Sequence, residues 1–104
     1  MSRKTLISRF LWNGREFNLR KPVEYKVYCQ DGVWMYECGV LGLISYDRNR
    51  AEARRNFNEE FAALWDNIAL ADVSELTQDA IELKNTLREI VADVETAPNK
   101  DKPD

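Results

Sequence analysis

The fold is decided by residues 23–68, which read VEYKVYCQDGVWMYECGVLGLISYDRNRAEARRNFNEEFAALWDNI. Apolar and polar residues alternate on both sides of Asp31-Gly32, a dipeptide that favours a two-residue hairpin turn because both of its positions need a positive φ. The alternation predicts two antiparallel strands, and residues 42–46 predict a third. After Asn49 the apolar residues recur at helical spacing. The stretch therefore predicts three strands followed by one long amphipathic helix.

The turn at Asp31-Gly32 also fixes the register of the predicted hairpin. It places Tyr28 opposite Met35 and Lys26 opposite Glu37, and a cross-strand charge pair of this kind supports the register. The other face is apolar and consists of Tyr25, Val27, Cys29, Trp34, Tyr36 and Cys38. We expect the long helix to lie across this cysteine-bearing face.

The two cysteines, Cys29 and Cys38, share a face but lie about four residue pairs apart, which is roughly 13 Å at ~3.3 Å per residue. This separation exceeds the limit of ~7 Å between the Cα atoms of a disulfide. We therefore expect two reduced thiols in the core. The chain has no histidine, which also argues against a zinc site.

A further hairpin is predicted near the N-terminus, where Thr5–Trp12 and Arg15–Arg20 flank the turn dipeptide Asn13-Gly14. This register places Phe10 opposite Phe17. It gathers the apolar residues of one face, namely Leu6, Phe10, Trp12, Phe17 and Leu19. Pro22 has no N–H to donate, so we expect it to separate this hairpin from the next strand.

Two helices are predicted from their capping residues and their apolar spacing. Asn49, with Glu52 three residues later, has the pattern of a helix N-cap. The apolar positions of this helix are Ala53, Phe57, Phe61, Leu64, Trp65 and Ile68. Thr77 caps a second helix over residues 77–94, with Ala80, Leu83, Leu87, Ile90, Val91 and Val94 as its apolar positions. This second helix either completes the core or forms a dimer contact, and the sequence leaves both open.

The length of 104 residues predicts one domain with a core of its own. We expect a single α+β domain over residues 1–94, in which antiparallel β-hairpins and a third strand pack against the long helix. Its parts are an N-terminal hairpin (5–20), a core (23–68) and a C-terminal helix (77–94), and the polar residues 95–104 predict a disordered tail. Since the sequence contains no run of about 18 apolar residues and no signal-peptide core, we expect a cytoplasmic protein without membrane contact.

Residues that could carry out chemistry are few in this sequence. The lack of histidine removes the commonest general base and metal ligand, and neither cysteine has a histidine to activate it. No glycine-rich phosphate loop is present. Asp31 and Asp47 are explained by roles in a turn and at a helix start. We therefore predict no catalytic, cofactor-binding or metal-binding residue and no enzymatic activity.

Charge is distributed unevenly along the chain. Residues 1–26 carry seven bases and two acidic residues, a net charge of +5, so the remaining residues carry −8 and the whole chain −3. An acidic helical half repels the phosphates of nucleic acid and suits a basic protein partner. RNA binding through the basic N-terminal hairpin is an alternative, because aromatic residues on strands can stack bases. However, the pattern places Phe10 and Trp12 on the buried face.

Four segments of the chain, in order, carry a likeness to a known family: Glu24–Tyr28 leading to Asp31-Gly32, Trp34–Cys38, Leu41–Tyr46 and the helix opening Arg50–Phe57. Together they resemble the HicB-like antitoxin domain over about residues 23–64. The resemblance implies a partial ribonuclease-H-like fold of three strands and a helix, without the catalytic carboxylates of the nuclease. It also implies an antitoxin that binds and neutralises a small basic RNA-cleaving toxin of the HicA type and that self-associates as a homodimer or a larger oligomer.

The chain departs from the pattern of this family in three places. It adds the N-terminal hairpin, it shows no evident strand after the long helix, and its last helix is too short for a helix-turn-helix. The short helix argues against the DNA binding that many members use for autoregulation. The missing strand leaves open whether residues 5–20 supply sheet pairing instead.

The strand face opposite the cysteines gives a candidate interface, with a partner or with a second copy, formed by Tyr28, Met35 and Tyr46. The alternative is that the second helix or the N-terminal hairpin covers these three side chains. A further alternative for the function is a stand-alone interaction or structural domain of the same fold without a toxin partner.

Overall fold

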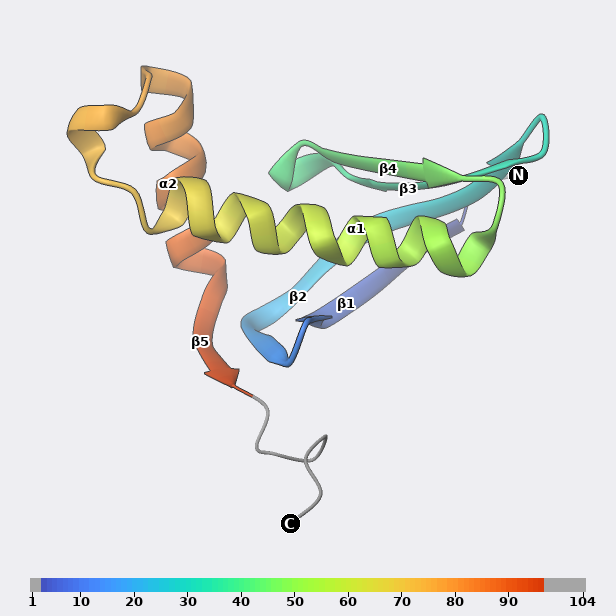
Figure 1. The fold of residues 1–104 in the computed structure, drawn as a ribbon, viewed down its shortest axis with the longest axis horizontal. Coiled ribbons are helices and arrows are strands. Elements are labelled where there is room, and N and C mark those ends of the chain that lie inside the picture. The colour runs from blue at the N-terminus through green and yellow to red at the C-terminus, as the bar shows by residue number, and fades with distance from the viewer. Residues whose placement is uncertain (1–2, 97–104) are drawn as a thin grey trace, which may run out of the picture.

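The structure is a computed structural model that describes residues 3–96, with side chains from Thr5 onward (Figure 1). Among these residues it contains five strands and two α-helices. In chain order they are β1 (Arg3–Trp12), β2 (Arg15–Gln30), β3 (Val33–Cys38), β4 (Leu43–Asp47), α1 (Arg50–Leu64), α2 (Gln78–Ile90) and β5 (Val91–Thr96). Shorter helical turns are η1 (Gly39–Leu41), η2 (Trp65–Ala69, a π-helix) and η3 (Val73–Glu75). The antiparallel sheet with its two helices confirms the α+β class.

The long strand β2 lies inside the sheet and pairs on both of its edges. β1 pairs along one edge, and the other edge pairs with β3 through residues 26–30 and with β5 through residues 15–19. β4 pairs with β3, so that β1 and β4 end the four-strand path of the sheet, and β5 is a further edge strand beside the first half of β2 (Figure 1). The N-terminal hairpin therefore does supply sheet pairing, the question that the sequence left open.

Both predicted hairpin turns are present, and each has positive φ angles at its two central residues. The φ values are 51° and 82° at Asn13 and Gly14, and 54° and 78° at Asp31 and Gly32. Such angles are those of a type I′ turn, whose twist matches that of the flanking strands. The predicted registers are confirmed in both hairpins, with Phe10 opposite Phe17 and the pairs Cys29–Trp34 and Tyr28–Met35 aligned.

One part of the predicted N-terminal hairpin is wrong. Between the pairs Ile7–Val23 and Arg9–Asn18, four residues of β2 lie opposite Ser8 alone, and β2 continues through Pro22 rather than ending there. The irregularity shifts the alternation of β1, because a slip of one residue moves each side chain to the opposite face. Ile7 therefore packs against the core, whereas Leu6, which was assigned to the buried face, is 67% exposed.

The C-terminal helix is shorter than predicted. It ends at Ile90, and the residues that follow form β5 instead of continuing the helix to residue 94. Val91 is buried and Val94 packs against the core. Their spacing of three residues is that of a helix, and the strand brings both to the inner face through the register shift between Val91 and Asp93. β-branched residues favour the extended form where a free strand edge can receive their backbone. Glu95 and Thr96 of the predicted tail belong to β5, and residues 97–104 lie outside the described residues.

The core lies between the sheet and α1 and is mainly aromatic. The rings of Phe10 and Phe61 stack with their centroids 4.0 Å apart, and Phe17 meets the edge of Phe61 at 5.2 Å. Phe57, one turn earlier on α1, contacts Tyr36 of β3 at 5.6 Å. We call the face of the sheet toward α1 the inner face and the opposite face the outer face. The prediction that the long helix covers the cysteine-bearing face is correct.

The two α-helices begin at the residues predicted to cap them, and a side chain of α2 bonds to the segment that follows α1. The Asn49 side chain accepts the Glu52 N–H at 3.0 Å, and the Thr77 hydroxyl accepts the Ala80 N–H at 3.2 Å. Lys84 of α2 donates to the carbonyl oxygens of Ala69 and Ala71 at 2.8 and 2.6 Å. These carbonyls follow the end of α1, where a cation is favourable. Lys84 therefore holds α2 against the end of the long helix.

The aromatic core generates a prediction for stability. We expect Phe61→Ala to lower the free energy of unfolding by about 3–5 kcal/mol, because the change leaves a cavity against two further rings. Leu11→Ala is the matched control on the sheet, because Leu11 is 52% exposed and should change stability by no more than about 0.5 kcal/mol. Urea unfolding followed by circular dichroism measures both. Equal losses in the two variants would contradict this placement of the core.

An ion pair joins the N-terminal hairpin to the turn after α1. The two terminal nitrogens of Arg15 donate to the two carboxylate oxygens of Asp66 at 2.8 and 3.0 Å. This hydrogen bonding holds the pKa of Asp66 below its ordinary value, because it favours the ionised carboxylate. Since the Asp66 side chain is 44% exposed, solvent screens much of the attraction.

The depressed pKa of Asp66 sets the direction of its effect on stability. The pair contributes above the ordinary pKa of about 3.9 and loses its contribution as the pH falls through the lower folded-state pKa. We expect Asp66→Asn to cost about 0.2–1 kcal/mol at neutral pH and to converge with the wild type at low pH. Urea unfolding across the acid range measures this difference, with Glu59→Gln on the exposed side of α1 as the control. A constant difference at every pH would rule out the ion pair as the cause.

Candidate functional site

The candidate site is the outer face of the sheet, which exposes large apolar side chains. Ile44 and Tyr46 of β4 are 58% and 64% exposed. On β1, Leu6 and Leu11 have the same orientation and are 67% and 52% exposed. Scattered exposed apolar residues are ordinary on protein surfaces, but a set that shares one sheet face marks a candidate interaction surface.

The three residues predicted as an interface lie in one row across this face. Tyr28 of β2 is opposite Met35 of β3, and Met35 is opposite Tyr46 of β4. Tyr28 and Met35 are half-buried, while Tyr46 is exposed. The structure therefore brings all three together on the face away from α1. The alternative that the N-terminal hairpin or the second helix buries them does not hold for Tyr46.

A hydrogen bond fixes the position of one member of this row. The Tyr28 hydroxyl donates to the carboxylate of Glu37, which belongs to the next residue pair on the same face of the sheet. The hydrogen bond to Glu37 raises the pKa of Tyr28, because the carboxylate stabilises the protonated phenol. Lys26 is the cross-strand neighbour of Glu37. The row thus has a fixed tyrosine beside a pair of opposite charges.

The outer face carries a set of acidic side chains, which we call the acidic rim, on one side of the row formed by Tyr28, Met35 and Tyr46. Acidic side chains with outward orientation come from β2, β3 and β5, and they are Glu16, Glu24, Glu37, Asp93 and Glu95. Among side chains from Thr5 onward, the bases of this face are Arg9 and Lys26, and Arg9 forms an ion pair with Glu16. The exposed apolar side chains of this face therefore lie mainly on the edge strands β1 and β4, and the acidic ones lie between them on β2 and β3 and beside them on β5.

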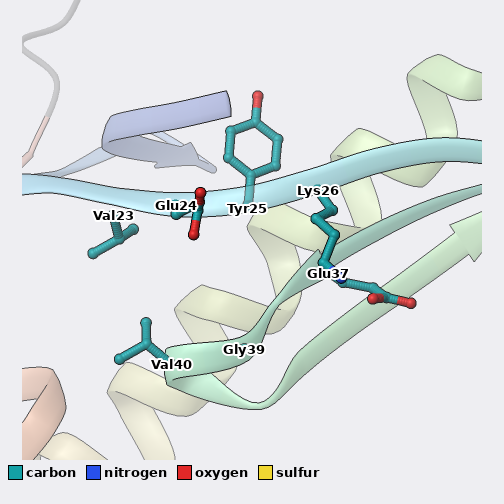
Figure 2. Close-up of a pocket in the computed structure, with 7 residues that line it drawn as sticks. All are labelled: Val23, Glu24, Tyr25, Lys26, Glu37, Gly39 and Val40. Atoms are coloured by element: carbon teal, nitrogen blue, oxygen red, sulfur yellow. The ribbon is translucent and has the colours of Figure 1, made fainter. Parts of the chain in front are cut away.

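A hollow of about 360 Å³ opens beside β2, in the gap between the part of its edge that pairs with β3 and the part that pairs with β5 (Figure 2). Residues 20–25 of β2 pair with neither strand on this side. In Figure 2, Val23 of β2 and Val40 of η1 point toward one another across the hollow, and Lys26 and Glu37 lie at its other end. The hollow is therefore an apolar notch that adjoins the charged part of the outer face.

The cysteines and the two predicted turn carboxylates offer no assembled chemistry. Both cysteines are free, as predicted, but only Cys38 is buried, and burial raises the pKa of its thiol. Cys29 is exposed near the tip of the hairpin, beyond the cover of α1, so its predicted place in the core is wrong. The Asp47 carboxylate accepts the Asn49 N–H at 2.8 Å, in keeping with a role at the helix start. Within residues 3–96, no three side chains of metal-ligating type gather.

The N-terminal hairpin is poorly suited to bind RNA through its aromatic residues and bases. Phe10 and Phe17 are fully buried and cannot stack on a base. Three of the bases are engaged within the protein: Arg9 pairs with Glu16, Arg15 pairs with Asp66, and Arg20 donates to the Glu89 carbonyl oxygen. Part of the basic charge counted over residues 1–26 is therefore neutralised by carboxylates of the folded protein.

Two features of the surface were missed in the sequence. Four arginines, Arg48, Arg50, Arg54 and Arg55, lie at or near the start of α1, so the half of the chain that is acidic overall has a basic beginning. Arg50 lies over the Trp34 ring at 4.7 Å and Arg55 over the Trp12 ring at 5.3 Å. The spacing of these arginines was visible, but their tryptophan partners depend on how α1 crosses the sheet.

No family model, curated protein or solved structure matches this chain at a significant level. The likeness to the HicB-like domain therefore rests on the segments quoted above and stays a prediction. Among the described residues, no helix is both long and apolar enough to cross a membrane.

The contact between Tyr28 and Glu37 can be tested by titration. We expect Glu37→Gln to lower the pKa of Tyr28, because the carboxylate that favours the protonated phenol is lost. Alkaline titration followed by near-ultraviolet absorbance measures this. Since the chain has four tyrosines, Tyr28→Phe identifies the transition that belongs to Tyr28. If Glu37→Gln left that transition in place, the hydrogen bond would not exist in solution.

Proposed function

We propose that this protein is a non-enzymatic binding domain of the antitoxin type, which binds and neutralises a small basic RNA-cleaving toxin. The observation that carries the proposal is the outer face of the sheet, where the row of Tyr28, Met35 and Tyr46 lies beside Glu37, with the rest of the acidic rim farther along β2 and β5. Apolar side chains with charged ones beside them are the usual composition of a protein interface. Because the charges of the acidic rim are negative, they favour a basic partner.

The chemistry of an RNA-cleaving enzyme explains why such a partner would fit. An enzyme that holds RNA contacts phosphates through lysine and arginine side chains. A surface with carboxylates beside an apolar row can occupy those bases and exclude the RNA. Glu24 is exposed on this face, and Glu37 is held in place by Tyr28. The proposal places the protein in the cytoplasm, where the RNA substrate of the toxin is found.

The family likeness supports the same proposal from a different direction. The segments that resemble the HicB-like domain are those that form β2, β3, β4 and the start of α1. The predicted order of three strands and a helix is therefore the order in which these segments fold. β5 is an addition that extends the sheet at the other end of β2, and β1 is an addition that pairs with β2 at both of its ends.

The proposal is tested by co-expression with the product of a neighbouring gene for a small basic protein. We expect a stable complex and rescue of growth from that protein. Glu24→Lys should weaken the complex by about tenfold or more, because it reverses a charge on the rim. Glu59→Lys on α1 is the matched control and should bind as the wild type does. Affinity is measured by calorimetry. If the two proteins formed no complex and growth were not rescued, the proposal would be dismissed.

The same experiments separate the alternatives. A domain of the same fold that has lost its toxin would show a folded chain with no basic neighbour and no complex. RNA binding would give retention on RNA that weakens steeply with salt. The buried phenylalanines and the paired arginines of the N-terminal hairpin favour the protein partner over RNA.

A further inference from the structure

Among the described residues β1, β4 and β5 each have an edge that pairs with no other strand, and these edges differ in how well they are protected against further pairing. β1 has a register irregularity at Ser8 and an exposed charged residue, Arg9, both of which discourage a further strand. β4 pairs with β3 without interruption from Leu43 to Asp47, and it contains no lysine, arginine or proline. β5 has a register shift between Val91 and Asp93 and contains two carboxylates, Asp93 and Glu95. β4 is therefore the least protected of the three edges.

The register of the hairpin determines which backbone groups of β4 face outward. The two-residue turn makes Gln30–Val33 a hydrogen-bonded pair, and such pairs alternate along antiparallel strands. In this alternation Val27–Tyr36 is a non-hydrogen-bonded pair, so the backbone N–H and C=O of Tyr36 point toward β4. Tyr36–Ser45 is therefore a hydrogen-bonded pair. The N–H and C=O groups of Ile44 and Tyr46 then point away from the sheet. No strand of residues 3–96 pairs with them.

Ser45 lies between these two residues and adds an independent observation. It is 4% exposed on the inner face, and its hydroxyl oxygen is one of two buried side-chain oxygens that have no hydrogen-bond partner among the described residues; the other is that of Thr5 on β1. A buried hydroxyl without a partner costs free energy, so native structures usually provide one. The partner is missing at the outermost strand of the sheet, where a further strand would supply one.

We propose that two copies of this chain pair in antiparallel fashion through β4, on a two-fold axis at Ser45. In that register Ile44 of each copy lies opposite Tyr46 of the other, and their backbone groups form four hydrogen bonds. Ser45 faces Ser45 of the second copy in a non-hydrogen-bonded pair, in which the side chains come closest. The two hydroxyls then bond to each other, and each gains the partner that it lacks.

The second copy is the occupant that these observations favour. Any extended strand can bond to the exposed backbone, but the same strand supplies a hydroxyl at the matching position and an apolar partner for both Ile44 and Tyr46. A two-fold axis at this residue makes the contact self-complementary, and it closes the assembly at two copies. This inference goes beyond the proposed function and requires no toxin partner.

The inference is tested by a disulfide at the axis. In the full chain with Cys29→Ser, which removes the exposed native thiol, Ser45→Cys places two thiols opposite each other. The Cα atoms of such a pair lie about 4.5 Å apart, within the range that a disulfide accepts. We expect mild oxidation to give a covalent dimer. Ser8→Cys in the same background lies on the protected edge β1 and should stay monomeric. Equal cross-linking of both variants, or none in either, would overturn the pairing.

A second measurement decides the matter if Ser45→Cys does not fold. Sedimentation equilibrium of the wild type should give the mass of a dimer. Ile44→Lys, at an exposed side chain of β4, should weaken dimerisation by about tenfold or more, because a charge on an edge strand opposes pairing. Leu11→Lys, at a similarly exposed position of β1, should leave the dimer intact. A monomeric wild type, or a dimer unaffected by Ile44→Lys, would overturn the inference.

Discussion

The strand β2 is the constraint on which the rest of the structure depends. It is the one strand that β1, β3 and β5 all pair with, and its two edges are shared among them. Phe17 and Val27 are an even number of residues apart, so regular alternation along β2 turns both toward the helix. Ile7 and Phe10 of β1 are three residues apart, and the irregularity opposite residues 19–22 of β2 brings both onto the inner face. It lies where Pro22 lacks the N–H that a regular ladder would require.

The aromatic core follows from this strand and in turn fixes the helix. Phe10 and Phe17 are paired across the N-terminal turn, and both contact Phe61, so the middle of α1 is held over that hairpin. Phe57 is held over β2 and β3 by Tyr25 and Tyr36. All of these aromatic side chains lie on the inner face. The outer face therefore keeps its apolar row and its acidic rim free for other contacts.

Local signals made much of this fold predictable, and non-local pairing explains what was missed. The two turn dipeptides determined both hairpin registers, and with them the row of Tyr28, Met35 and Tyr46 on the candidate face. Asn49 and Thr77 marked the helix starts for the same local reason. β5 could not be found, because the spacing of Val91 and Val94 is that of a helix, and only pairing with the distant edge of β2, through a register shift, makes these residues a strand. The exposure of Cys29 and the surroundings of Ser45 could not be predicted for the same reason, because they depend on where α1 and the sheet end.

The place of β5 in the sheet has a consequence for how the chain is made. The Asn18 side chain donates to Asp93, which is 75 residues later in the sequence. During synthesis, the N-terminal hairpin leaves the ribosome long before the strand that completes its edge, and contacts between distant residues form slowly. Residues 15–19 of β2 are then an open template for pairing until β5 emerges. The strand that covers this part of β2 is thus made long after the hairpin that it completes.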